Sequence, residues 1–119
     1  MDRLRSRVQY QAVARGAKVA RPGLVLQAAA AIDLESPPRL GFTVSRKVGN
    51  AVARNRVRRR LKEAVRVIGC GSFRPGMDYV VIGRRAAIDR AFSDLVGDLV
   101  AGLAAVERAN SAAGDRHGR

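Results

Sequence analysis

The architecture of this chain follows from residues 39–66, which read RLGFTVSRKVGNAVARNRVRRRLKEAVR. The first part, 39–47, alternates apolar residues with small or polar ones, and this period of two predicts a strand. The alternating apolar residues are Leu40, Phe42 and Val44. A Gly-Asn pair then breaks the strand. Asn50 is a suitable N-cap for a helix predicted at 51–68, because its side-chain oxygen can accept a backbone N–H.

The predicted helix at 51–68 has one apolar face and one basic face. At about 100° per residue, a single arc collects the apolar side chains that we expect to pack on the core. These are Val57, Leu61, Ala64, Val65 and Ile68. A Gly-Cys-Gly sequence follows and ends the helix.

The rest of the chain completes an α+β pattern. The other predicted elements are a helix at 6–16, strands at 24–32 and 77–82, and a last amphipathic helix at 89–109. The order α-β-β-α-β-α predicts a two-layer α–β sandwich. We expect residues 1–109 to form a single domain and residues 110–119 a flexible C-terminal tail.

Net charge is the strongest compositional signal. The 119 residues carry 23 Lys and Arg against 10 Asp and Glu, a formal charge of +13. Such a surface attracts polyanions, which include RNA, DNA and anionic membranes. No apolar run is long enough to cross a bilayer, and no signal peptide is evident. With one cysteine, Cys70, no internal disulfide can form, so we expect a cytoplasmic protein with no membrane partner.

Nine basic residues lie between positions 46 and 66, opposed by Glu63 alone. On the helix, Arg54, Arg58, Lys62 and Arg66 stand four residues apart in one row, where like charges repel. An external polyanion would relieve that repulsion, and each Arg fork matches two phosphate oxygens. The remaining outer-face positions are Asn55, Arg56, Arg59 and Arg60. The plain alternative is a solvated basic face.

No side chain is a candidate catalyst. The only histidine, His117, lies in the polar tail, and the acidic residues are scattered along the chain. A general base requires a His or a carboxylate beside a nucleophile. We therefore expect no catalytic residue and no metal site in the protein alone.

The segment 39–66 closely resembles the signature of the ribonuclease P protein family, in which a strand ending in Ser and two basic residues leads through Gly-Asn-Ala-Val into an Arg-Asn-Arg helix. The resemblance implies a left-handed strand-helix-strand crossover across residues 39–83. It also implies a protein subunit that binds ribonuclease P RNA and the 5′ leader of precursor tRNA. In that family the catalytic RNA positions the Mg²⁺ ions, and no obligate protein partner is expected.

Several positions match the family residue by residue. In the helix these are Arg54, Asn55, Arg56, Arg58, Arg59 and Lys62, and at the strand end Arg46 and Lys47. The resemblance implies that the helix faces the catalytic RNA. Lys62 stands where Arg is more usual, which keeps the charge but loses the bidentate fork.

For the leader, the resemblance implies a cleft between the first helix and the sheet. The expected leader-binding residues are Tyr10, Phe42 and Ser45. Tyr10 matches a family aromatic that can stack on unpaired bases, whereas Phe42 could equally be a plain core residue. Ala14 and Gln27 stand where the family often has aromatics. We therefore expect phosphate and hydrogen-bond contacts to contribute more to leader binding here than aromatic stacking does.

Two other classes of protein remain possible from charge alone. One is a structural, ribosomal-type RNA-binding protein without a processing role, and the other is an architectural DNA protein. The chain has no helix-turn-helix pair, zinc ligand set or leucine heptad for major-groove reading. The 39–66 signature favours the ribonuclease P subunit over both.

Overall fold

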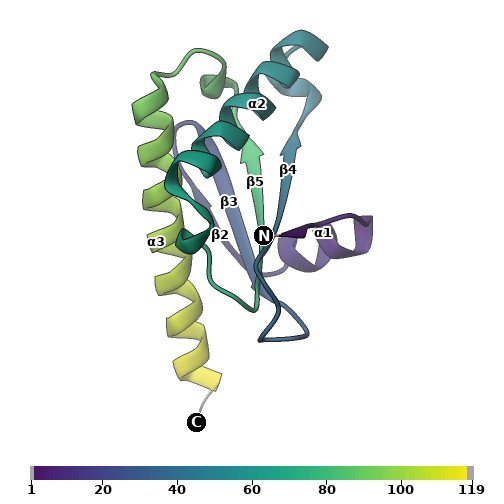
Figure 1. Ribbon diagram of the computed structural model, residues 1–119, viewed down its shortest axis with the longest axis vertical. Helices are drawn as coiled ribbons and strands as arrows, with labels where there is room; N and C mark the ends of the chain where they lie inside the picture. Colours follow the sequence, from purple (N-terminus) through teal and green to yellow (C-terminus); the bar gives the residue numbers. More distant parts are fainter. Residues whose placement is uncertain (1, 118–119) are drawn as a thin grey trace.

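A computed structural model describes residues 2–117, with side chains described as far as Ala109 (Figure 1). Three α-helices pack on one five-stranded sheet. In chain order the elements are β1 Asp2–Arg3, α1 Arg7–Ala14, β2 Ala17–Ala20, β3 Leu24–Ala30, β4 Arg39–Val44, the 3₁₀ turn η1 Arg46–Val48, α2 Ala51–Ile68, the 3₁₀ turn η2 Cys70–Ser72, β5 Met77–Gly83, the 3₁₀ turn η3 Arg85–Ile88, and α3 Phe92–His117. Within residues 2–117, no helix is both long and apolar enough to span a membrane.

The sheet has the strand order β1-β4-β5-β3-β2, and β4 and β5 are parallel neighbours joined through α2. In Figure 1 both strands point upward, α2 passes in front of the sheet, and β5 lies to the left of β4. A connection with this path is left-handed, against the right-handed rule for such crossovers. The predicted sandwich and its unusual crossover are therefore confirmed.

The two faces of the sheet carry cores of different size. On one face, α2 and α3 cover a large cluster of aliphatic side chains that includes Leu26, Leu61, Val81 and Leu99. On the other face, the short helix α1 covers a small cluster of Leu4, Val13 and Val80, with Tyr10 and Ile82 beside it. A capping box at Ser6 starts α1, since the Ser6 hydroxyl accepts from the Gln9 N–H at 3.2 Å. Because α1 is short, the sheet face it covers is only partly buried.

Two edge strands were not predicted, so the six-element order is extended by β1 and β2. β1 pairs with β4 over two residues, and β2 forms a hairpin with β3 over four. Strands this short are specified by the partner edge rather than by their own pattern.

Several element bounds also differ from the prediction. The strand predicted at 39–47 ends at Val44, because the next residues turn into η1, and the strand predicted at 24–32 ends at Ala30. The helix predicted at 89–109 begins at Phe92, after η3, and continues to His117. Residues 118–119 of the predicted tail lie outside the described residues, and the flexibility of 110–119 stays a prediction.

Candidate RNA-binding surface

Local sequence signals place α2 with its basic face outward. The Asn50 side chain accepts the Ala53 N–H at 2.9 Å, as expected of an N-cap. Val57 and Leu61 are 0% and 1% exposed, which directs the apolar arc onto the sheet. Gly83 of β5 lies directly beneath, where an added Cβ would overlap Val57, so α2 approaches the sheet closely. The cations on the other side of the helix are therefore presented outward.

The row toward the open edge of β4 consists of Arg54, Arg58 and Lys62. Arg58 donates to Asn55 Oδ1 at 3.1 Å, and Lys62 Nζ lies 5.9 Å from the ring centroid of Phe42. Arg54 Nε is buried and has no hydrogen-bond partner within the part of the chain that the structure describes. No acidic group among the described residues is paired with any of the three cations, so this row is suited to an external anion.

The opposite side of α2 is held by backbone carbonyls. Arg56 Nε donates to the Ile88 carbonyl at 2.7 Å. Arg60 Nη1 donates to the carbonyls of Ala87 and Ile88 at 3.3 and 3.2 Å, and its Nη2 donates to that of Arg90. From the sequence, Arg60 was expected to be an outward RNA contact. In the structure its terminal nitrogens join α2 to the segment that follows β5.

Arg66, the fourth member of the predicted row, forms an exposed ion pair with Glu63, with Nε 3.0 Å from Glu63 Oε2. The hydrogen bond from Arg66 lowers the pKa of the Glu63 carboxyl. An exposed pair of this kind adds little stability. The pair does reduce the charge repulsion at the C-terminal end of the row. The cations of the row that remain without an acidic partner are Arg54, Arg58 and Lys62.

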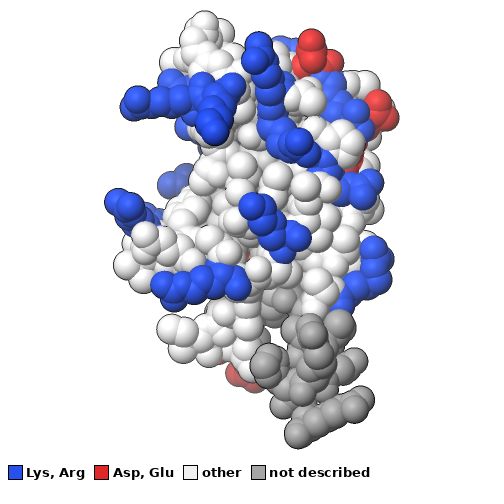
Figure 2. All heavy atoms as spheres, turned by 180° about the vertical axis from the view of Figure 1, so that it is seen from behind, with Lys and Arg blue, Asp and Glu red and all other residues white. Residues whose placement is uncertain are grey.

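The ends of the two parallel strands bring further cations together. Ser45, Arg46 and Lys47 are exposed just after β4. Val44 pairs in register with Gly83, so Arg84 and Arg85 emerge beside them at the same edge of the sheet. Figure 2 shows Lys and Arg gathered at this upper end of the molecule. Arg84 and Arg85 were not among the RNA contacts expected from the sequence. The sequence signal that could have identified them is a basic pair directly after an apolar strand.

Two of the three expected cleft residues, Tyr10 and Phe42, meet in one open cavity of about 350 Å³ beside β4. Its lining residues are Arg3, Leu4, Tyr10, Leu40, Gly41, Phe42, Arg58 and Lys62. Tyr10 is half-buried and reaches the cavity from α1, while Phe42 packs against the main core beneath Lys62. Phe42 therefore packs on the core, as a plain core residue does, and also lines the cavity, as expected of a leader-binding residue. Ser45 is exposed and is not among the lining residues.

Gly41 provides the space in which the Tyr10 ring lies. A Cβ at residue 41 would come within 2.6 Å of Cε1, Cζ and Oη of Tyr10. We therefore expect Gly41→Ala to displace the ring and to lower the free energy of unfolding by about 1–3 kcal/mol. The shift of the Tyr10 ring-proton resonances and urea unfolding would measure both effects. Gly71→Ala, where an added Cβ meets nothing within 4 Å, is the matched control. An unmoved Tyr10 ring in Gly41→Ala would contradict this packing.

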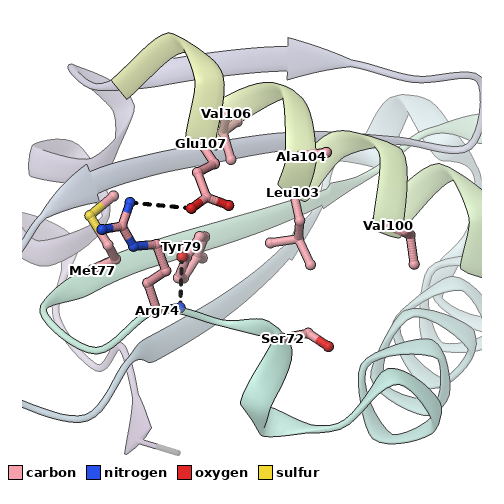
Figure 3. Close-up of a pocket in the computed structure, with 9 residues that line it drawn as sticks. All are labelled: Ser72, Arg74, Met77, Tyr79, Val100, Leu103, Ala104, Val106 and Glu107. Atoms are coloured by element: carbon pink, nitrogen blue, oxygen red, sulfur yellow. Dashed lines mark hydrogen bonds and ion pairs between the residues drawn. The ribbon is translucent and has the colours of Figure 1, made fainter. Parts of the chain in front are cut away.

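A second cavity of about 210 Å³ lies on the other face, between α3 and the segment before β5 (Figure 3). Apolar side chains line most of it, including Met77, Val100 and Leu103. At its border, Arg74 Nη1 lies 3.4 Å from Glu107 Oε1, so the charges there are paired. This cavity is separate from the basic surface.

Acidic residues do not gather anywhere on this surface. Among the side chains that the structure describes, residues 2–109, no three of His, Cys, Asp or Glu come together as possible metal ligands. Asp78 and Asp98 are buried in bidentate pairs with Arg39 and Arg90. These described side chains therefore do not fit a magnesium site.

An α–β sandwich with a row of uncompensated cations beside an aromatic-lined cavity belongs to the class of polyanion-binding proteins. The family model for ribonuclease P matches residues 1–107. The chain belongs to the ribonuclease P protein family, and so is a protein subunit of that endoribonuclease of tRNA 5′ processing, a partner of ribonuclease P RNA.

Relatives and solved structures agree with this assignment. The ribonuclease P protein component of Gluconacetobacter diazotrophicus is 55% identical over 98 residues, covering 82% of this chain and 84% of the relative. That of Paramagnetospirillum magneticum is 50% identical over 107 residues, covering 87% and 80%. The Staphylococcus aureus RNase P protein superposes with a TM-score of 0.72 at 28% identity, covering 89% of this chain and 97% of that one. The Thermotoga maritima RNase P protein gives 0.71 at 26% identity, covering 91% and 97%.

Proposed function

We propose that this chain binds ribonuclease P RNA through the outward face of α2 and the basic ends of β4 and β5, and binds the 5′ leader of precursor tRNA in the cavity beside Tyr10. The observation that carries the proposal is the continuity of the two regions. Arg58 and Lys62 belong to the α2 row and also line the cavity that contains Tyr10. A single RNA strand can therefore contact phosphate-binding cations and an aromatic ring together.

The proposed RNA contacts on α2 are Arg54, Asn55, Arg56, Arg58, Arg59, Lys62 and Arg66, while Arg60 joins α2 to the 84–90 segment. Of these, Arg54, Arg58 and Lys62 are the primary phosphate contacts, because no acidic group among the described residues is paired with them. Arg46 and Lys47 extend the same surface at the strand end. Phosphate contacts release counterions, so binding should fall steeply with salt.

In the proposed assignment, Mg²⁺ and the hydrolysis of the phosphodiester bond belong to the RNA subunit. The protein side chains bind and position the substrate near that RNA. A cytoplasmic location is proposed as well, because the sole cysteine, Cys70, is exposed and unpaired, which suits a reducing compartment.

A single-turnover cleavage assay tests this function. Precursor tRNA is mixed with ribonuclease P RNA at low magnesium and moderate salt, with and without the protein. Restoration of cleavage at the correct 5′ position is the expected result. If the protein binds the RNA and leaves cleavage unchanged at every magnesium concentration, the structural RNA-binding alternative replaces the proposal.

Tyr10→Ala separates leader binding from RNA-subunit binding. Loss of one base-stacking ring is worth about 1–2 kcal/mol, so we expect roughly tenfold weaker binding of leader-bearing precursor by the holoenzyme. Affinity for leaderless tRNA and for ribonuclease P RNA should not change. Val8→Ala, at a position 73% exposed on the same helix, is the control. Equal losses for leader-bearing and leaderless tRNA would rule out the leader contact.

A further inference from the structure

Asp98 on α3 is an acidic residue buried far from the basic row. It is 4% exposed, and both of its oxygens are used. Oδ2 accepts the Gly23 N–H at 2.9 Å and Arg90 Nε at 2.7 Å, while Oδ1 accepts Arg90 Nη2 at 3.2 Å. A buried carboxylate with these partners holds Arg90 in one orientation, since every alternative leaves a desolvated charge unpaired.

Arg90 transmits this constraint to α2. Arg90 is the last residue of the segment 84–90. Backbone carbonyls of this segment accept hydrogen bonds from Arg56 and Arg60 of α2. The carbonyl of Arg90 itself is one of the acceptors for Arg60. A continuous chain of hydrogen bonds thus runs from Asp98 through Arg90 to two guanidinium groups of the RNA-binding helix.

The hydrogen bond from Gly23 to Asp98 also connects the carboxylate to the cations at the end of β5. The Gly23 carbonyl accepts the Arg84 N–H at 3.2 Å, and Arg84 Nη1 donates to the Arg21 carbonyl at 2.9 Å. A Cβ at residue 23 would come within 2.8 Å of Asp98 Oδ2, so the turn closes directly on the carboxylate. Arg84 and Arg85 therefore leave β5 from a turn that Asp98 anchors.

We propose that Asp98 is a positioning residue for the RNA-binding surface, acting through Arg90, Arg60 and the 84–90 segment to orient Arg56 and Arg84. The inference rests on the proposed RNA contact surface. No residue of this network lines the Tyr10 cavity. The effect should therefore appear in the binding of ribonuclease P RNA and not in stacking of the leader.

Asp98→Asn distinguishes positioning from charge, because the two predict different changes in the affinity for RNA. The substitution removes one negative charge, so charge alone predicts equal or tighter RNA binding. Loss of positioning predicts weaker binding, by about 3–10-fold, or ~1 kcal/mol. Glu35→Gln is the matched control, because Glu35 is exposed, its carboxylate has no hydrogen-bond or ion-pair partner among the described residues, and its loss changes the net charge equally.

The experiment measures the affinity of the full chain for ribonuclease P RNA at fixed salt, with the hydrogen exchange of arginine Nε–H groups followed by NMR. In wild type, the Nε–H of Arg56 and of Arg90 should exchange slowly because both are hydrogen-bonded. Weaker RNA binding by Asp98→Asn, with faster Arg56 Nε–H exchange and a retained amide spectrum, is the expected result. Binding by Asp98→Asn as tight as that by Glu35→Gln would overturn the proposal.

Arg90→Lys tests the same network at constant charge and decides the matter if Asp98→Asn does not fold. Lysine cannot reproduce the two-pronged contact with Asp98, so a similar loss of RNA affinity is expected, whereas the exposed substitution Arg108→Lys should have no effect. Equal affinities for these two variants would refute the positioning role. Because the readout is RNA binding, a failure of the protein to promote cleavage would overturn the proposed function without affecting this test.

Discussion

Replacing Arg58 and Lys62 together by glutamine is expected to lower the affinity for ribonuclease P RNA by about 10–100-fold near 0.15 M salt, at about 1 kcal/mol per lost phosphate contact. Both side chains face away from the core, and neither forms an ion pair among the described residues. The slope of log affinity against log salt should also become shallower, by about one for each cation removed. Filter binding across a salt series measures both quantities.

The matched control for this pair is Arg74→Gln with Arg108→Gln. These exposed cations lie near the C-terminal half of α3, and their loss changes the net charge by the same amount. If RNA binding depends on net charge alone, the two double variants will lose the same affinity. A loss confined to Arg58 and Lys62 would instead locate the RNA on the α2 row.

Leu61→Ala is expected to lower the free energy of unfolding by about 3 kcal/mol, because removal of a large buried side chain leaves a cavity that the surroundings fill only partly. Leu61 is 1% exposed, and its Cδ1 lies 3.3 Å from the position of a Cβ on Gly83. For a domain whose total stability is about 5–15 kcal/mol, this is a large fraction. Urea unfolding followed by circular dichroism measures the change in midpoint.

Val67→Ala on the same helix provides the comparison. Val67 is 53% exposed, so its truncation should change stability by no more than about 0.5 kcal/mol. A similar cost for the two substitutions would mean that the apolar arc of α2 does not carry the packing. The Leu61 variant should also bind RNA more weakly at temperatures where it begins to unfold, because its cations are then no longer held in a row.

Elements with strong local signals were predicted from the sequence with little error. The helix expected at 51–68 is α2 with the same bounds, because Asn50 caps it, Gly69 ends it, and its apolar residues repeat at the helical period. The strands predicted at 39–47 and 77–82 are observed at 39–44 and 77–83, because consecutive residues there carry the alternating or continuous apolar pattern of a strand. Elements that depend on a partner edge, β1 and β2, were missed.

Among the expected site residues, residue type and spacing identified the basic helix, whereas Tyr10 was expected from the resemblance to the ribonuclease P protein family. The sequence alone could not show which groups each cation of α2 contacts. Arg58 and Lys62 line the cavity, whereas Arg56 and Arg60 bind carbonyls of the 84–90 segment. That segment is about 30 residues further along the chain, and no local pattern relates the two.

The sequence by itself determined the sandwich class, the amphipathic α2 and the positive charge, because helical period, capping and net charge are properties of neighbouring residues and composition. Tertiary structure decided which cations are available to RNA. Carbonyl acceptors, the Glu63 carboxylate and the ring of Phe42 come to α2 only when the chain folds around it. It also placed Arg84 and Arg85 beside Arg46, since parallel pairing of β4 and β5 ends both strands at the same edge.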